Sequence, residues 1–148
     1  MQLKTAEELR ITEEQRCALV KALAFLQEDK IKYRPLEGKL LGFKSNGKVD
    51  YFNMRAWWRE YECGTVCCIG GTAQALSGTS FPNSSVFRNR NLNNLFYPSN
   101  QEAWNATPQQ AARALSNYLS TGYASWHKAM RNCHLTLNGL DCDRNMGA

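Results

Sequence analysis

"CGTVCCIGGTAQAL", residues 63–76, places three cysteines and two adjacent glycines in one short run. Its apolar side chains recur at helical spacing, at Val66, Ile69, Ala73 and Leu76. Thr65 is a residue type that caps helices, so the pattern predicts a helix that begins after Thr65 and ends before Gly78. Cys67 and Cys68 would then lie in its first turn, where free N–H groups and the helix dipole lower a thiol pKa. Buried, inert cysteines satisfy the same pattern.

Gly70 and Gly71 need a separate explanation, because each glycine destabilises a helix interior by about 1 kcal/mol relative to alanine. Two in succession indicate a close approach of another backbone, a break in the helix, or a ligand that presses on the turn. We predict close packing under Trp57 or Trp58.

The residues before this run predict a hairpin and a short helix. Asn46-Gly47 favours a type I′ turn between two strands, near Leu40–Lys44 and Lys48–Phe52. Asn53 then caps a predicted helix with one large apolar stripe, formed by Met54, Trp57, Trp58 and Tyr61. Such a stripe usually marks a buried face, so we predict that it belongs to the core and is not a platform for stacking a ligand ring.

Two longer helices have clear start signals. Thr12 and Gln15 form a capping box for a helix over Glu13–Gln27, and Cys17 lies on its apolar stripe as a small core residue. Thr107, with Pro108 and Gln110, begins a second helix that Gly122 ends. These elements predict a mainly α fold, a compact helical domain with one short β-hairpin, over residues 1–148 as a single globular domain.

The charge of the chain is +5 at pH 7, but it does not form a basic stripe. No acidic residue occurs between Cys63 and Gln101, and this stretch holds only Arg88 and Arg90 as basic residues. A nucleic-acid partner is therefore not expected. The chain has no apolar run of the length that spans a membrane and no signal-peptide pattern at its start, so we expect a cytoplasmic protein without membrane contact. Its four tryptophans also raise a homo-oligomer as an alternative.

A long Asn-rich stretch, residues 77–100, is predicted to be a loop, and long loops in compact domains are often functional. Its amide and guanidinium groups could hydrogen-bond a polar partner. The predicted binding residues are Arg88, Asn89, Arg90, Asn91, Asn93 and Asn94.

Two kinds of cysteine chemistry are open alternatives. A thiol enzyme would use Cys63 or Cys67 as nucleophile and His127 or His134 as base. A zinc site would need four ligands, drawn from Cys63, Cys67, Cys133 (or His134) and Cys142, but their spacing lacks the usual two-residue knuckles. The sequence contains no motif for a nucleotide or other cofactor, and none is expected.

Three segments together resemble a group of small uncharacterised proteins from bacteria and their phages. The segments are "FNMRAWW" (52–58), "CGTVCCIGGTAQAL" (63–76) and "TPQQAARALSNYLSTGYASW" (107–126). Cys63, Gly64, Thr65, Cys67 and Gly70 match the C-G-T-x-x-C-x-x-G pattern of that group, whereas Cys68 departs from it. The resemblance implies a compact helical domain and no established activity.

Because no complete catalytic set is present, we interpret the chain as a non-catalytic binding protein. It would be borne by a phage or mobile element and act by occupying a host protein, as an anti-defence inhibitor does. A protein partner is thus expected, and a cysteine-dependent enzyme is the alternative.

Overall fold

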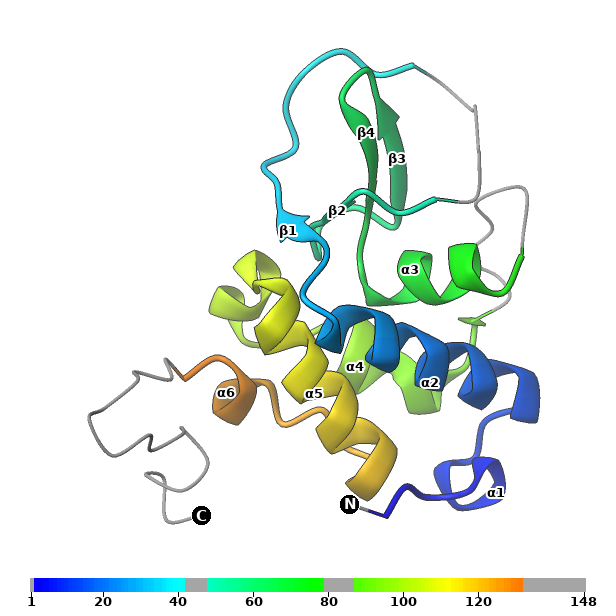
Figure 1. Ribbon diagram of the computed structural model, residues 1–148. Coiled ribbons are helices and arrows are strands. Elements are labelled where there is room, and N and C mark those ends of the chain that lie inside the picture. Colours follow the sequence, from blue (N-terminus) through cyan, green and yellow to red (C-terminus); the bar gives the residue numbers. More distant parts are fainter. Residues whose placement is uncertain (1, 42–47, 79–86, 132–148) are drawn as a thin grey trace.

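The computed structural model describes residues 2–41, 48–78 and 87–131 of the chain. It shows a mixed α/β fold with a small sheet at one end and helices at the other (Figure 1). The prediction of a mainly α fold is therefore too simple. The helices over 13–27 and 108–121 form as expected, but residues 58–67, where helices were predicted, contribute strands that the periodicity did not indicate.

The sheet has four strands: β1 (Lys32–Tyr33), β2 (Tyr51–Phe52), β3 (Trp58–Tyr61) and β4 (Gly64–Cys67). Their order is β1-β2-β4-β3, with β1, β2 and β4 parallel and β3 antiparallel to β4. The backbone of residues 39–41 runs along the outer edge of β3, where the Leu41 N–H donates to the Glu60 carbonyl at 2.8 Å.

The larger helices pack below the sheet. α2 (Glu13–Gln27) contacts both α3 (Ile69–Leu76) and α5 (Pro108–Thr121), and α3 connects this layer to β4. Shorter helices complete the fold: α1 (Ala6–Leu9), η2 (Arg90–Leu92), α4 (Asn93–Phe96), η3 (Gln101–Asn105) and α6 (Trp126–Ala129). One main core joins these elements, and all four tryptophans lie in it or pack against it. Excess exposed tryptophan therefore gives no reason to expect a homo-oligomer.

The capping boxes of α2 and α5 confirm the two predicted helices. Thr12 and Gln15 exchange side-chain-to-backbone hydrogen bonds at the start of α2, and Thr107 and Gln110 do so at the start of α5. Gly122 ends α5 with φ 90°. The prediction that Cys17 lies in the core is wrong, because its thiol is exposed.

The predicted helix after Asn53 is instead a turn followed by β3. The Asn53 side chain accepts a hydrogen bond from the Arg55 N–H at 2.8 Å and donates one to the Arg34 carbonyl at 2.8 Å. It thus fastens a turn rather than capping a helix. The prediction of burial was sound, since Met54, Trp58 and Tyr61 are buried and Trp57 packs against the core. Apolar spacing did not distinguish a twisted strand from a helix here, and aromatic residues favour strands.

The predicted pairing of the Lys48–Phe52 strand with residues near Leu40 is wrong. β2 has strand neighbours on both sides, so Tyr51 and Phe52 do not pair with residues near Leu40. The Asn46-Gly47 turn itself lies outside the described residues. The hairpin that the structure contains is formed by β3 and β4, with Tyr61 paired to Gly64.

Candidate functional site

The Cys-Gly run forms a buried junction between β4 and α3. Thr65 is not a helix cap but a strand residue, whose N–H donates to the Asp50 carboxylate at 2.8 Å. Cys67 ends β4, and Cys68 is the residue that caps α3, with its sulfur accepting from the Gly71 N–H at 3.5 Å. Neither cysteine therefore lies in the first turn of the helix.

Gly70 and Gly71 confirm the predicted close approach. A Cβ atom on Gly70 would overlap the Trp57 ring, and one on Gly71 would overlap the backbone carbonyl oxygen of Trp57. The Trp57 ring is itself fixed, because its Nε1–H donates to Gln74 at 2.8 Å and it packs edge-on against Phe96. The glycines are explained by packing, although the element that approaches is a turn rather than the predicted helix.

The thiols at this junction are poor nucleophiles. Burial raises the pKa of Cys67 well above its ordinary value, and the nearby Cys68, Glu60 and Asp50 raise it further. Burial also raises the pKa of Cys68 to about 11, although backbone N–H groups at the start of α3 act in the opposite direction. The raised pKa of Cys67 argues against the depressed pKa that the enzyme hypothesis needs there.

Of the remaining candidate residues, the two that the structure describes, Cys63 and His127, do not meet. Cys63 is exposed in the turn between β3 and β4, whereas His127 lies on α6 in a separate part of the molecule (Figure 1). Cys133, His134 and Cys142 lie outside the described residues. Within residues 2–41, 48–78 and 87–131, no three His, Cys, Asp or Glu side chains are arranged to hold a metal ion.

Residues 87–100 of the Asn-rich stretch were predicted to be a loop, but they contain two short helices, η2 and α4. Two of the predicted binding residues hold this part in place, because the Asn89 and Asn91 side-chain amides both donate to the Arg10 carbonyl, at 3.0 and 3.1 Å. Arg88, Arg90 and Asn93 are exposed. Binding by these residues stays a prediction.

A groove of about 730 Å³ lies next to α4 and includes two of the predicted residues. We call it the tyrosine groove. Its walls come from α4, the start of η3 and the segment that joins α5 to α6, and its lining consists of Asn93, Asn94, Tyr97, Ser99, Asn100, Tyr123, Ser125, Trp126 and His127.

Asn94 fixes the segment that joins α5 to α6, which forms part of the tyrosine groove. Its side-chain oxygen accepts from the Ala124 N–H at 2.7 Å, and its amide donates to the Gly122 carbonyl at 3.2 Å. From the other side, Asn117 on α5 donates to the Ala124 carbonyl at 3.0 Å. The joining segment is thus held by side chains from two helices and needs no regular secondary structure of its own.

This fastening presents aromatic side chains to solvent. Ser125 has φ 50°, a left-handed conformation that is uncommon for a non-glycine residue. Both tyrosines that line the groove are exposed, Tyr123 to 68% and Tyr97 to 58%. Trp126, which also lines it, is buried, with its Nε1–H donating to the Leu95 carbonyl at 3.1 Å.

The polar side chains of the groove are mostly unpaired. Among the described residues, no hydrogen bond or ion pair is formed by the side chains of Asn93, Tyr97, Ser99, Tyr123, Ser125 or His127. Asn100 accepts from the Glu102 N–H through its side-chain oxygen. The groove therefore offers hydroxyl, amide and imidazole groups on a fixed backbone, and its lining includes no carboxylate.

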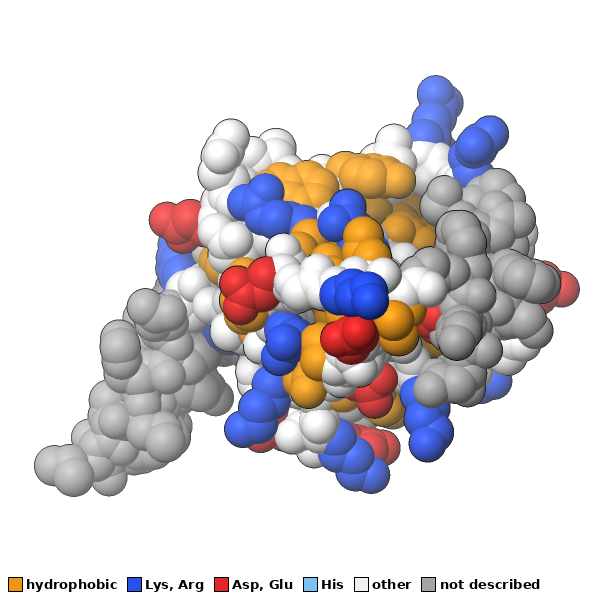
Figure 2. Space-filling view, turned by 90° about the horizontal axis from the view of Figure 1, so that it is seen from above, with side chains coloured by type: hydrophobic (Ala, Val, Ile, Leu, Met, Phe, Trp, Pro, Cys, Tyr) orange, Lys and Arg blue, Asp and Glu red, His pale blue; other side chains and the backbone are white. Residues whose placement is uncertain are grey.

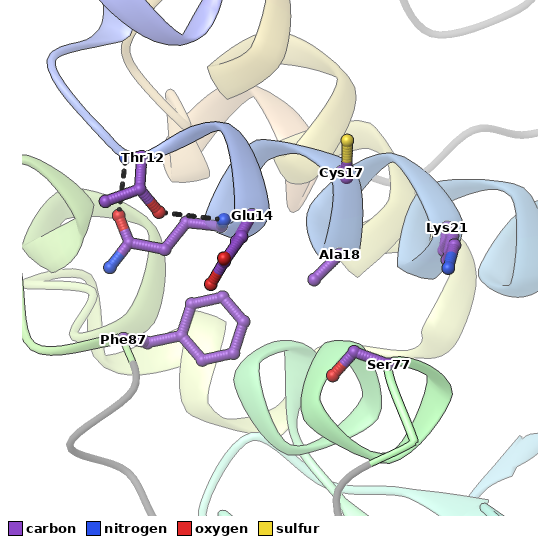
Figure 3. Close-up of a pocket in the computed structure, with 8 residues that line it drawn as sticks. Thr12, Glu14, Cys17, Ala18, Lys21, Ser77 and Phe87 are labelled. Carbon is purple, nitrogen blue, oxygen red and sulfur yellow. Dashed lines mark hydrogen bonds between the residues drawn. The ribbon is translucent and has the colours of Figure 1, made fainter.

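A second hollow, of about 390 Å³, lies between α2, the end of α3 and Phe87. Figure 3 shows that Glu14, Ala18 and Ser77 point toward it, whereas the sulfur of Cys17 points away. Cys17 is among the lining residues, and the charged side chains of the lining are one acid, Glu14, and one lysine, Lys21.

Sequence reasoning identified only Asn93, Asn94 and His127 of the tyrosine groove. It missed Tyr97, Ser99, Asn100, Tyr123, Ser125 and Trp126. One local signal could have pointed to Tyr123, which directly follows the helix-ending Gly122 and so lies in a turn. The pairing of this turn with α4 joins residues about 30 positions apart and has no local signal.

Comparison with known proteins gives no match to this chain among protein-family models, curated proteins or solved structures. The resemblance to bacterial and phage proteins stays a prediction. Within the described part of the chain, none of the helices combines the length and the hydrophobicity that a membrane span requires.

Proposed function

We propose that this chain is a non-catalytic binding protein that occupies a partner protein with the tyrosine groove. The observation that carries this proposal is the set of unpaired polar and aromatic side chains on a fastened backbone around the groove. Tyr, Ser and Asn are the residue types that dominate antibody binding loops, because Tyr gives a large contact area with few rotatable bonds and Ser and Asn adapt their hydrogen bonds.

The charge around the groove favours an acidic partner surface. No carboxylate lines the groove, and no acidic residue occurs in the sequence from Cys63 to Gln101. Arg88 and Arg90 precede α4 and are exposed, and Lys128 follows His127 on α6 and is also exposed. Complementary charge would speed the encounter and select against basic partners.

The resemblance to bacterial and phage proteins adds the expectation that the partner is a bacterial host protein. Inhibition by occupation requires no catalytic group in this chain. A non-catalytic mode of action agrees with the raised pKa values of Cys67 and Cys68, which argue against thiol catalysis at the buried junction.

A photo-crosslinking side chain at position 123 tests the proposal in bacterial cells. We expect one specific protein adduct. An excess of wild-type protein without the crosslinker should prevent its formation, whereas an excess of the Tyr97→Ala/Tyr123→Ala variant should not. The same crosslinker at Lys21, which is exposed on α2 away from the tyrosine groove, is the matched control. The identified partner should then bind the double variant at least tenfold more weakly, since an aromatic hot spot contributes about 2 kcal/mol or more. Equal affinity for wild type and double variant would reject the tyrosine groove as the binding face. An adduct with a second copy of this chain would show that the groove serves self-association and not binding to a partner protein.

A further inference from the structure

The face of the sheet opposite the main core carries two basic side chains, Lys32 and Arg59, on its two edge strands, and a small second core that includes the buried Val66 lies between them. The strand register places Lys32, Tyr51, Val66 and Arg59 side by side across β1, β2, β4 and β3. The opposite row, with Phe52, Cys67 and Trp58, belongs to the main core. Figure 2 looks onto this end of the molecule, where Lys and Arg side chains lie among hydrophobic ones.

Arg34 is the best-positioned cation of this face. Its N–H donates to the Phe52 carbonyl at 3.1 Å, and its own carbonyl accepts from the Asn53 side chain at 2.8 Å. The guanidinium carbon lies 5.0 Å from the centre of the Tyr51 ring. The backbone and the ring together hold the guanidinium in one place, as a cation–π contact does.

These cations have no acidic partner among the described residues. The ion pairs there join Lys4 to Glu8, Arg16 to Glu13, Lys30 to Glu28 and Lys39 to Glu62, and none involves Lys32, Arg34 or Arg59. Glu37, three residues after Arg34, forms no ion pair with it.

The Arg34 Nε atom is, in addition, buried without a hydrogen-bond partner. A buried donor that lacks an acceptor destabilises a protein by about 1–3 kcal/mol, and more when the group is charged. An anion bound to the guanidinium would supply that acceptor if the Arg34 side chain turned to bring Nε to the surface, because this atom is buried in the free protein. The site therefore has both an unsatisfied donor and uncompensated charge.

We propose that Arg34 and Lys32 bind a phosphate group. Arg34 would present its planar fork to two phosphate oxygens, and Lys32, two residues earlier on the same face of the sheet, would add a second charge. Two cations without a carboxylate between them match a phosphate monoester, with a charge near −2, better than a singly charged carboxylate or phosphodiester. The proposal is independent of the tyrosine groove, because it uses none of its residues.

Titration of the ¹⁵N-labelled full chain with inorganic phosphate, at constant ionic strength in chloride, tests this site. We expect saturable shifts of the Arg34 Nε–H signal. Affinity should fall at least about tenfold in Arg34→Gln, and several-fold in Arg34→Lys, which keeps the charge but loses the fork. Lys30→Gln is the matched control, since it removes a charge two residues from Lys32 that is already paired with Glu28. It should change affinity less than about twofold.

The proposal would be overturned if wild type showed no saturation, if Lys30→Gln and Arg34→Gln weakened binding equally, or if acetate bound as tightly as phosphate. Tighter binding of a single-stranded oligonucleotide without a terminal phosphate would also overturn it, in favour of a nucleic-acid surface. Circular dichroism of Arg34→Gln shows whether the variant is folded. If Arg34→Gln is unfolded, the Arg34→Lys and Lys32→Gln variants test the proposal instead, since each should bind phosphate more weakly than Lys30→Gln.

Discussion

The β4–α3 junction and the tyrosine groove both contain residue types that often carry chemistry, but they use them in opposite ways. At the junction, Cys67 and Cys68 are buried and the Trp57 Nε1–H is bonded to Gln74. In the groove, Tyr97 and Tyr123 are exposed and the side chains of Asn93 and Ser125 are unpaired with the rest of the described protein. Reactive residue types are thus not evidence of a site by themselves. What distinguishes the groove is that its backbone is fixed while its side chains remain available.

The largest effect expected from adding a single methyl group is at the junction. Gly71→Ala places a methyl group against the Trp57 carbonyl oxygen, which is backbone and has little freedom to move. We expect a loss of at least about 3 kcal/mol in the free energy of unfolding, at the upper end of overpacking effects. Gly70→Ala meets the edge of the Trp57 ring and should lose less, about 1–3 kcal/mol. Urea denaturation measures both.

Lys21→Ala on α2 is the control for this pair, because Lys21 is exposed and alanine favours helix. It should change stability by less than about 0.5 kcal/mol. A Gly71→Ala protein as stable as Lys21→Ala would mean that the junction is not closely packed.

Alkaline pH should also act mainly on the buried side of this comparison. The folded protein holds the Cys68 proton up to about pH 11, whereas the ordinary thiol pKa is 9.0. Between these values the folded state binds more protons than the unfolded chain, so stability falls as pH rises, by about 1.4 kcal/mol per pH unit from Cys68. The raised pKa of Cys67 adds a loss of the same sign above pH 9. Below pH 9 the thiol should contribute no slope. Unfolding free energies measured from pH 7 to 11 test this expectation.

Tyr118 provides a check on the same measurement. Burial raises its pKa from 10.0 to about 12, so it should add its own loss of stability above pH 10. Tyr118→Phe should remove that upper part of the slope and leave the part between pH 9 and 10 unchanged. Identical curves for the two proteins would contradict the assignment to Tyr118.

A smaller effect is expected where the groove is fastened. Asn94→Ala removes the acceptor for the Ala124 N–H and the donor to the Gly122 carbonyl, and it should lower stability by about 1–3 kcal/mol. Asn93→Ala is the matched variant, since Asn93 is the exposed neighbour on the same helix. Thermal melting should separate the two. Equal melting temperatures would show that Asn94 does not hold the joining segment.

The sequence predicts those parts of the fold whose signals are local. The capping boxes at Thr12 and Thr107 involve residues three apart, and both helices begin where expected. Thr65 is a good cap by type, but it pairs with Glu60 on β3 and therefore lies in a strand, and its N–H bonds to the Asp50 carboxylate, 15 residues earlier. The glycine pair correctly predicted close packing because no other residue fits there.

The tyrosine groove could not be predicted from the sequence, because it is formed by contacts that residue spacing does not reveal. Asn89, Asn91 and Asn94 look alike in the sequence, yet they bond to Arg10, Gly122 and Ala124, up to 81 residues away. The side chain of Asn93, the fourth asparagine predicted to bind, forms no hydrogen bond with the described residues. Which asparagines are structural therefore followed from the tertiary fold alone.

The smallest expected effect is that of the exposed aromatic side chain itself. Tyr123 makes no side-chain hydrogen bond with the described residues and is 68% exposed, so Tyr123→Ala should change the free energy of unfolding by less than about 0.5 kcal/mol. Tyr118→Ala, at a tyrosine that is 1% exposed, should lose about 3–5 kcal/mol in the same urea experiment. Such a contrast would show that Tyr123 is dispensable for folding, so that any loss of partner binding in its variants reports on the interface. A large destabilisation by Tyr123→Ala would instead make the tyrosine part of the scaffold and remove the distinction between the groove and the junction.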